Sequence, residues 1–361
     1  TPVGVNNYVN KVSLQLLLRS PELLTSLGVI DNTPLDFHSG KLGRYDKRSE
    51  LEELEFLRES RRGLDDYGPE GLKGQELLSW KIVAWFFDDI IRQSEVEYSG
   101  YRVNQISGVM VNTPQFLTDS HVIEDEKSFR RYVERLNEFS RVIGETKVRV
   151  LDDRDNGVVP PDFIIEKALT GMRAFISEGA EANPLVTTLP EKIEKIDTIS
   201  DEMRTDLYRQ ATVAVETKII PMYEDMISIF EALLDDTNHD AGIWRLPEGD
   251  QIYRNALQSN NSTTLSADEI HNIGLSEVDR IEIEMQKILE SEGYSEGSLV
   301  SRIRQLMELP EHNFPNTDEG RLEQIDYLHQ INDQIMENIS DFFITIPPQP
   351  LEILRLSLIH I

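Results

Sequence analysis

Histidine is the side chain of this sequence best suited to zinc chemistry, and seven histidines are present: His38, His121, His239, His271, His312, His329 and His360. A helical zinc hydrolase needs two imidazoles one turn apart with a glutamate base between them, the pattern H-E-x-x-H. No two of these histidines are four residues apart, so the sequence lacks this motif. Cysteine is absent as well, which excludes thiolate metal sites, disulfides and a cysteine nucleophile within this sequence.

Two acidic stretches resemble calcium-binding loops only in part. "DDTNHDAG", from Asp235, has acidic or amide residues at alternate positions, as the first ligands of an EF-hand loop do. Ala241 stands where such a loop needs glycine, and Pro247 stands where it needs a bidentate glutamate. We therefore interpret this stretch, and "DDRDNG" from Asp152, as solvated turns between helices.

Several single residues allow both a structural and a functional interpretation. His271 lies one residue from an apolar stripe on a predicted helix, where a histidine is usually a hydrogen-bonded structural residue. Tyr101, Trp244 and Tyr253 each border a predicted loop, where an aromatic ring either seals the edge of the core or lines a cleft. Spacing alone does not decide between these alternatives.

The charge balance excludes two classes of partner. The sequence has 65 acidic and 36 basic residues, a net charge of −29. Nucleic acids and anionic lipid surfaces both require a basic surface, so we expect no nucleic-acid partner. No run of 18 apolar residues occurs, and we predict no transmembrane helix.

Helical periodicity dominates the chain. Apolar residues follow helical spacing in one stripe from Leu77 to Ile91 and in another from Phe129 to Ile143, with Gly144 as the expected helix stop. The fold class is therefore predicted as mainly α, a large multi-helix array with few or no short strands. "ISGVMVN", from Ile106, and "IWRLP", from Ile243, are the candidates for short strands or extended connectors.

Two further patterns predict where helices begin and break. Pro221 lies inside a long helical stretch and should kink or split it. Ser266 and Glu269 form a capping-box pattern at the start of a helix that Gly293 closes. An apolar stripe on that helix is expected to face inward; its members are Ile270, Ile273, Val278, Ile281, Met285 and Leu289.

Several segments, in one order along the chain, resemble a known family. They are "YRVNQISGVMVNTPQFLTDSHVI" from Tyr101, "GVVPP" from Gly157, "IWRLPEGDQIYRNAL" from Ile243, "TTLSADEIHNIGLSEVDRIEIEM" from Thr263 and "FFITIPPQPLEILR" from Phe342. The chain resembles the bacterial family known as domain of unknown function 885. The resemblance runs from about "PELLTSLGV" to Arg355.

This resemblance implies a metal-dependent hydrolase. Family members resemble gluzincin-type zinc peptidases of helical lobes, often secreted or lipoprotein-anchored, with an H-E-x-x-x-G-H-H helix downstream of the "PLE" segment. A periplasmic or lipoprotein-anchored location and a peptide or small amide substrate are implied. The zinc would be bound by a longer parent protein, and none by this chain. The substrate-binding or outer-shell candidates are Tyr101, Asn104, Tyr253, His271 and Arg280.

Both ends of the sequence suggest that it is a piece of that parent. The chain begins with Thr1, and the final "LSLIHI", 356–361, is also the translation of a transposon adapter end used in preparing sequencing libraries. We therefore expect one incomplete helical domain over residues 1–355, with two lobes of about 1–150 and 151–355 as the alternative division. Residues 356–361 are expected to be adapter-derived.

The alternative is a non-catalytic helical protein that binds a solute or a partner. An H-E-x-x-x-G-H-H stretch downstream would favour the enzyme, and its replacement by other residues would favour the binding protein. A structural solenoid is disfavoured because the sequence has no repeat of fixed period. The sequence does not specify the oligomeric state.

Overall fold

The computed structural model describes residues 4–31, 33–194 and 196–353. Over these residues the protein is mainly α, as predicted, with no strand and a single isolated bridge between Val103 and Gly108. No helix within these ranges is both long and apolar enough to cross a membrane. The segment predicted to be adapter-derived, 356–361, lies outside the described residues.

The chain forms two compact units, Thr1–Thr264 and Leu265–Ile361, which are described separately. The predicted lobes of about 1–150 and 151–355 stay a prediction. The helices of the first unit are α1 Val5–Leu17, α2 Pro21–Leu27, α3 Lys47–Asp65, α4 Gly74–Ser94, α5 Val109–Gln115, η1 Phe116–Ser120, α6 Glu126–Asp155, α7 Asp162–Ile176, α8 Pro184–Thr187, α9 Leu189–Ile193, α10 Asp201–Ala214, η2 Val215–Ile219, α11 Ile220–Leu233, η3 Leu234–Asp236, η4 Ile243–Arg245 and α12 Gly249–Asn261. Those of the second unit are α13 Ala267–Ser291, α14 Leu299–Met307, η5 Pro310–His312, α15 Asp318–Asn338 and η6 Ile339–Asp341.

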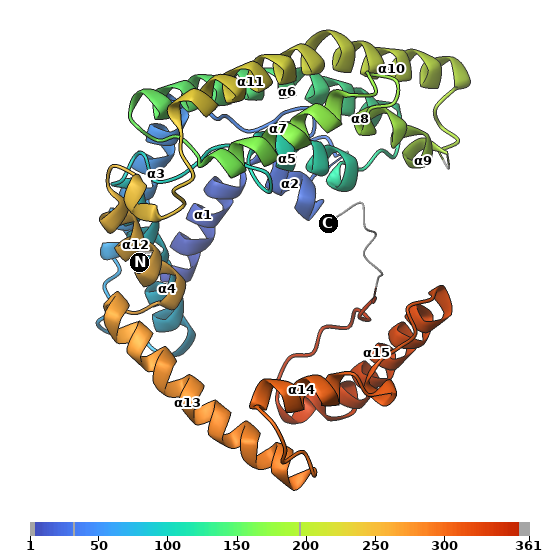
Figure 1. The fold of residues 1–361 in the computed structure, drawn as a ribbon. Helices are drawn as coiled ribbons and strands as arrows, with labels where there is room; N and C mark the ends of the chain where they lie inside the picture. The colour runs from blue at the N-terminus through green and yellow to red at the C-terminus, as the bar shows by residue number, and fades with distance from the viewer. Residues whose placement is uncertain (1–3, 32, 195, 354–361) are drawn as a thin grey trace. The chain divides into compact units, whose positions relative to one another are not determined.

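The larger core of the first unit surrounds α6. The predicted stripe on this helix is confirmed, because Phe129, Tyr132, Leu136, Phe139 and Ile143 are all fully buried. α6 packs against α10 and α11, and α11 also packs against α7 (Figure 1). One long apolar face on α6 thus organises the helices around it.

α6 is longer than the sequence predicted. Gly144 lies inside the helix and not at its end, so the predicted stop is wrong. A Cβ at Gly144 would lie 3.6 Å from Cε of Met222, in ordinary contact with α11. Apolar burial on both sides of Gly144 continues the helix despite the cost of about 1 kcal/mol that glycine carries. The helix begins at a capping box formed by Asp125 and Ser128.

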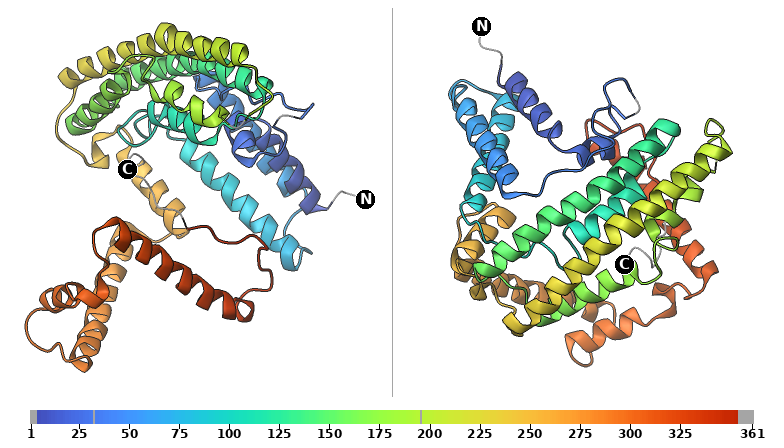
Figure 2. Two further views of the ribbon diagram at one scale, coloured as in Figure 1. Left: turned by 90° about the vertical axis from the view of Figure 1, so that its right-hand side faces the viewer. Right: turned by 90° about the horizontal axis from the view of Figure 1, so that it is seen from above.

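The long stretch around Pro221 is divided as predicted. α10 ends at Ala214, a π-helical turn follows as η2, and α11 begins with Pro221 in its first turn. Proline has no N–H and its ring clashes with the preceding turn, so the π-turn absorbs the irregularity. Figure 2 shows α10 and α11 running on from one another beside α6.

A smaller core joins α1, α3 and α4. Val12, Leu57, Ala84 and Phe87 are buried there, which confirms the inner face predicted for the stripe on α4. The candidate strand at Ile106 does not form: Ile106 and Ser107 lie in a loop, Gly108 forms only the isolated bridge to Val103, and Val109 begins α5. The candidate strand at Ile243 is also wrong, because its first residues form η4.

The second unit contains α13, α14 and α15. The predicted capping box of α13 is confirmed: Ser266 Oγ accepts from the Glu269 N–H, and Glu269 Oε2 accepts from the Ser266 N–H. The predicted inward stripe is wrong for most of its length. Leu289 is buried, whereas Ile273, Val278 and Ile281 are about half exposed.

Candidate functional site

A pocket of about 680 Å³ opens in the first unit between α3, α4 and the segment after α4. Leu51 and Leu54 of α3 and Phe86 of α4 form an apolar wall, and Tyr101 and Arg102 lie on its polar side. The volume is within the range of about 300 to 1,000 Å³ of small-molecule sites. Two amphipathic helices therefore supply the apolar surface, and a loop supplies the polar groups.

The polar side of the pocket is held by a network of ion pairs. Arg102 Nη1 lies 2.8 Å from Glu50 Oε1, and its Nε lies 2.9 Å from Asp153 Oδ2. Buried Arg149 joins the same network, with Nη2 3.0 Å from Glu50 Oε2. Burial raises the pKa of Asp153, and the charges of Arg102 and Arg149 oppose that shift. The network fixes the Arg102 side chain at the edge of the pocket.

Of the predicted site residues, Tyr101 lines this pocket. Burial raises the pKa of its hydroxyl, which the charge of Arg245 partly offsets, so at neutral pH the hydroxyl can donate a hydrogen bond. Asn104, three residues later, organises a turn. Its Oδ1 accepts from the N–H groups of Ile106 and Ser107, each at 2.9 Å, and its Nδ2 donates to Ser107 Oγ at 2.7 Å.

The other predicted site residues lie elsewhere. Tyr253 is on α12 of the first unit and is about half exposed. His271 and Arg280 are exposed on α13 of the second unit. Arg280 forms ion pairs within that helix, with Nη2 2.8 Å from Glu277 and Nη1 2.9 Å from Glu284. The predicted roles of these residues stay predictions.

The two acidic stretches of the sequence meet beside a second pocket of about 640 Å³. Arg154, near the end of α6, pairs with Asp236, the last residue of η3, at 2.7 Å. Trp244 also lines this pocket and is 76% exposed. The interpretation of "DDRDNG" as a turn is wrong for residues 152–155, which form the end of α6, and holds for the two residues after it. "DDTNHDAG" begins in η3 and is non-helical from Thr237 onward, as predicted.

A buried polar centre around Arg135 was not found from the sequence. Arg135, on α6, has no exposed surface. Its guanidinium donates to the Lys41 carbonyl at 3.0 Å, to Thr25 Oγ1 at 2.7 Å and to Nδ1 of His121 at 2.7 Å. Burial lowers the pKa of Arg135 to about 10, opposed most by Glu22, and it stays charged at neutral pH. Through these hydrogen bonds, Arg135 holds the segment that precedes α3 against helix α6.

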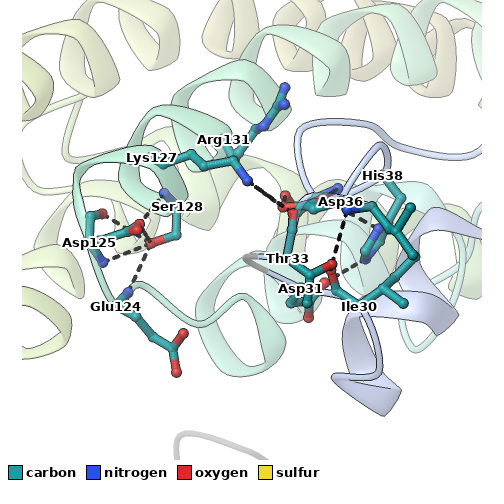
Figure 3. A network of polar contacts seen from close by, with 12 residues as sticks. Ile30, Asp31, Thr33, Asp36, His38, Glu124, Asp125, Lys127, Ser128 and Arg131 are labelled. Atoms are coloured by element: carbon teal, nitrogen blue, oxygen red, sulfur yellow. Dashed lines mark hydrogen bonds and ion pairs between the residues drawn. The ribbon is translucent and has the colours of Figure 1, made fainter.

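A cluster of Asp31, Asp36 and His38 lies in that same segment (Figure 3). One donor atom from each of the three side chains lies within 4.8 Å of the others. Asp31 also lines a pocket of about 410 Å³ with Ser39 and Glu124. The signal that the sequence carries for this cluster is the spacing D-x-x-x-x-D-x-H, which the sequence analysis did not single out.

Comparison with known proteins identifies the family. Residues 21–358 match the family described as bacterial protein of unknown function, DUF885. The chain belongs to the DUF885 family. No curated protein matches the sequence. The match ends at residue 358, and the adapter origin of residues 356–361 stays a prediction.

Two solved structures have a similar fold. A protein from Colwellia psychrerythraea, described as a "putative lipoprotein", aligns with a TM-score of 0.80 at 23% identity, over 98% of this chain and 62% of its own. A "putative lipoprotein" of unknown function from Shewanella oneidensis aligns with a TM-score of 0.60 at 14% identity, over 96% and 59%. The DUF885 chain therefore spans about three-fifths of the length of these two proteins.

Proposed function

We propose that this chain forms the substrate-binding part of a metal-dependent hydrolase that acts on a peptide or a related amide. The observation that carries the proposal is the pocket of about 680 Å³ beside Tyr101. The segment that contributes Tyr101 and Arg102 is one of the segments that resemble the family. The apolar wall of α3 and α4 suits an apolar substrate side chain, and the polar side suits the amide.

The zinc site that the resemblance implies does not fit the residues of this chain. Such a site needs two histidines and a glutamate base on one helix, and the sequence contains no H-E-x-x-H. Among the described residues, the cluster of side chains that could bind a metal ion is Asp31, Asp36 and His38, and it contains a single histidine. No bond-breaking step is therefore assigned to this chain. Its part is to bind and orient the substrate.

The apolar wall and Tyr101 would each bind a different part of the substrate. Leu51 and Phe86 would cover an apolar side chain of the substrate, with a gain of about 25 cal/mol per Å² of apolar surface removed from water. The protonated Tyr101 hydroxyl can donate to a substrate carbonyl oxygen. Arg102, held by Glu50 and Asp153, keeps the polar side in one arrangement.

The binding role is tested by calorimetric titration with two short peptides blocked at both ends, one carrying a leucine side chain and one carrying aspartate. We expect the leucine peptide to bind more tightly. Leu51→Ser should weaken its binding about tenfold or more, because a contact worth about 1–3 kcal/mol is lost. Leu78→Ser is the matched control, since Leu78 is an exposed leucine on α4 outside the pocket.

Two outcomes would overturn the proposal. Failure of both peptides to bind, or equal weakening by Leu51→Ser and Leu78→Ser, would exclude the pocket as the substrate site. Incubation of the chain with peptide and ZnCl₂ should give no cleavage. Turnover that a chelator abolishes would show that this chain contains its own catalytic centre and that the assigned division of roles is wrong.

A further inference from the structure

The segment between α2 and α3 contains three side chains of types that bind metal ions, and they lie outside the pocket assigned to the substrate. Asp31, Asp36 and His38 fall within eight residues of one another along the chain and converge in space (Figure 3). The segment is ordered by its own bonds: the Asp36 N–H donates to the Thr33 carbonyl at 3.1 Å, and Thr33 Oγ1 donates to the Ile30 carbonyl at 2.8 Å. Arg135 holds its far end through the His38 carbonyl at 3.3 Å.

Burial makes the charges of this cluster costly. The side chains of Asp36 and His38 have no exposed surface. Asp36 accepts from the Ser39 N–H at 3.0 Å and from Ser39 Oγ at 2.6 Å, and Nζ of Lys127 lies 3.8 Å from its Oδ2. Lys127 is an exposed lysine, and its 3.8 Å contact with Asp36 is an ion pair beyond hydrogen-bond range. A buried carboxylate gains most from a cation held directly against it.

The His38 ring points to where such a cation would lie. Its Nε2 is 2.5 Å from Asp31 Oδ1, and its Nδ1 is 3.4 Å from Asp36 Oδ1. Neither ring nitrogen has a hydrogen-bond partner of normal geometry. The contact at Nε2 is short enough to need a proton between the atoms. When that is the only proton on the ring, Nδ1 turns its lone pair toward a carboxylate oxygen, and two acceptors repel unless a cation lies between them.

The 3.4 Å separation matches a shared metal ion. Two ligands of tetrahedral zinc, each about 2.0–2.2 Å from the metal, lie about 3.3 Å apart. A histidine that binds metal through one nitrogen usually donates its other N–H to a carboxylate, which is the position of Asp31. The pocket of about 410 Å³ is lined by Asp31 and Ser39, which contact the His38 ring and the Asp36 carboxylate respectively.

We propose that His38 Nδ1 and Asp36 Oδ1 bind a divalent transition-metal ion of the zinc class, with Asp31 orienting the His38 ring from the other side. The site is separate from the hydrolytic zinc of the proposed function and does not depend on it. It also departs from the sequence-based expectation that this chain binds no metal. The ion would stabilise the segment between α2 and α3 against α6.

The proposal is tested by titrating the purified chain with ZnCl₂ at about 0.15 M ionic strength, where the Debye length is about 8 Å. Screening matters because the chain carries a net charge of −29 and attracts cations generally. We expect one saturable site per chain that is lost in His38→Gln and in Asp36→Asn. Asp31→Asn should weaken binding about 10- to 100-fold, the usual effect of losing an outer carboxylate.

Glu124→Gln is the matched control, because Glu124 is an exposed carboxylate of the adjoining pocket outside the cluster. Its affinity should equal that of the unmodified chain. Co²⁺ in place of Zn²⁺ gives a second measurement without any variant, since tetrahedral cobalt absorbs strongly in the visible. Absence of saturable binding would mean that a proton bridges His38 and Asp36, and binding that survives His38→Gln would place the ion elsewhere; either result overturns the proposal.

Discussion

His121 is expected to make the stability of the first unit depend on pH. Its ring is almost fully buried, with Nδ1 2.7 Å from Arg135 Nη1 and Nε2 3.2 Å from the Ser128 carbonyl oxygen. Arginine can only donate and a carbonyl can only accept, so Nδ1 is the acceptor and Nε2 carries the hydrogen. Protonation of Nδ1 would set two donors and two positive charges against each other.

The magnitude follows from the pKa. Burial, and after it the charge of Arg135, lowers the pKa of His121 from 6.5 to about 3; Lys192 adds to the shift, while the Ser128 bond and Asp36 oppose it. In the unfolded chain the imidazole takes up a proton below about pH 6.5, whereas in the folded chain it stays neutral down to about pH 3. Stability is therefore lost as pH falls through this window. At about 1.36 kcal/mol per unit, lowering the pH from 6 to 4.5 costs about 2 kcal/mol.

Urea unfolding followed by tryptophan fluorescence measures this effect in the first unit, because Trp80, Trp85 and Trp244 all lie there. The quantity to compare is the free energy of unfolding of the unmodified chain minus that of His121→Gln, as a function of pH. Taking this difference cancels the pH-dependent contribution of the carboxylates, which is the same in both proteins. We expect it to fall by about 2 kcal/mol between pH 6 and 4.5.

His239→Gln is the control, since the side chain of His239 is 82% exposed. Its difference from the unmodified chain should vary by less than about 0.5 kcal/mol over the same range. A constant difference for His121→Gln would mean that the ring has the same charge in the folded and unfolded chains. Arg135 and Ser128 would then not hold the His121 ring in its neutral form.

Three further predictions concern stability. Arg135→Met should lower the free energy of unfolding by about 3–5 kcal/mol in urea denaturation, because buried acceptors lose their charged donor, whereas Arg130→Ala on the exposed face of α6 should change it by less than about 0.5 kcal/mol. Leu136→Ala, at a fully buried position of α6, should cost about 2–5 kcal/mol by the same measurement. Ser266→Ala should weaken the start of α13 by about 1 kcal/mol, seen as faster hydrogen exchange of its first-turn amides.

The parts of the fold that the sequence predicts are those determined by neighbours along the chain. The buried face of α6, the break before Pro221 and the capping box at Ser266 each depend on residues within one or two turns. Gly144 shows the limit of this reasoning. Its local preference for ending a helix is overridden by apolar residues before and after it, which are buried against other helices.

The sites were less predictable because their parts come from distant segments. Tyr101 could be selected as an aromatic residue at a loop, but the pocket beside it exists only where α3 and α4 meet that loop. Arg135 carries no sequence signal, since its partners are largely backbone groups and small side chains about a hundred residues away, such as Thr25 and the Lys41 carbonyl. Asp31, Asp36 and His38 are close in sequence, and their spacing alone could have identified them.

Helix α13 shows what helical periodicity predicts about a stripe of apolar residues and what it leaves open. The stripe of Ile273, Val278 and Ile281 has the spacing of a buried face, yet these side chains are about half exposed, and only Leu289 at the end of the stripe is buried. The same kind of stripe on α6 is buried throughout. An apolar stripe therefore specifies which face of a helix is stabilised when another segment covers it, because that stabilisation comes from burying the helix's own apolar residues. It does not specify which segment covers the face, because the covering residues are not encoded in the stripe.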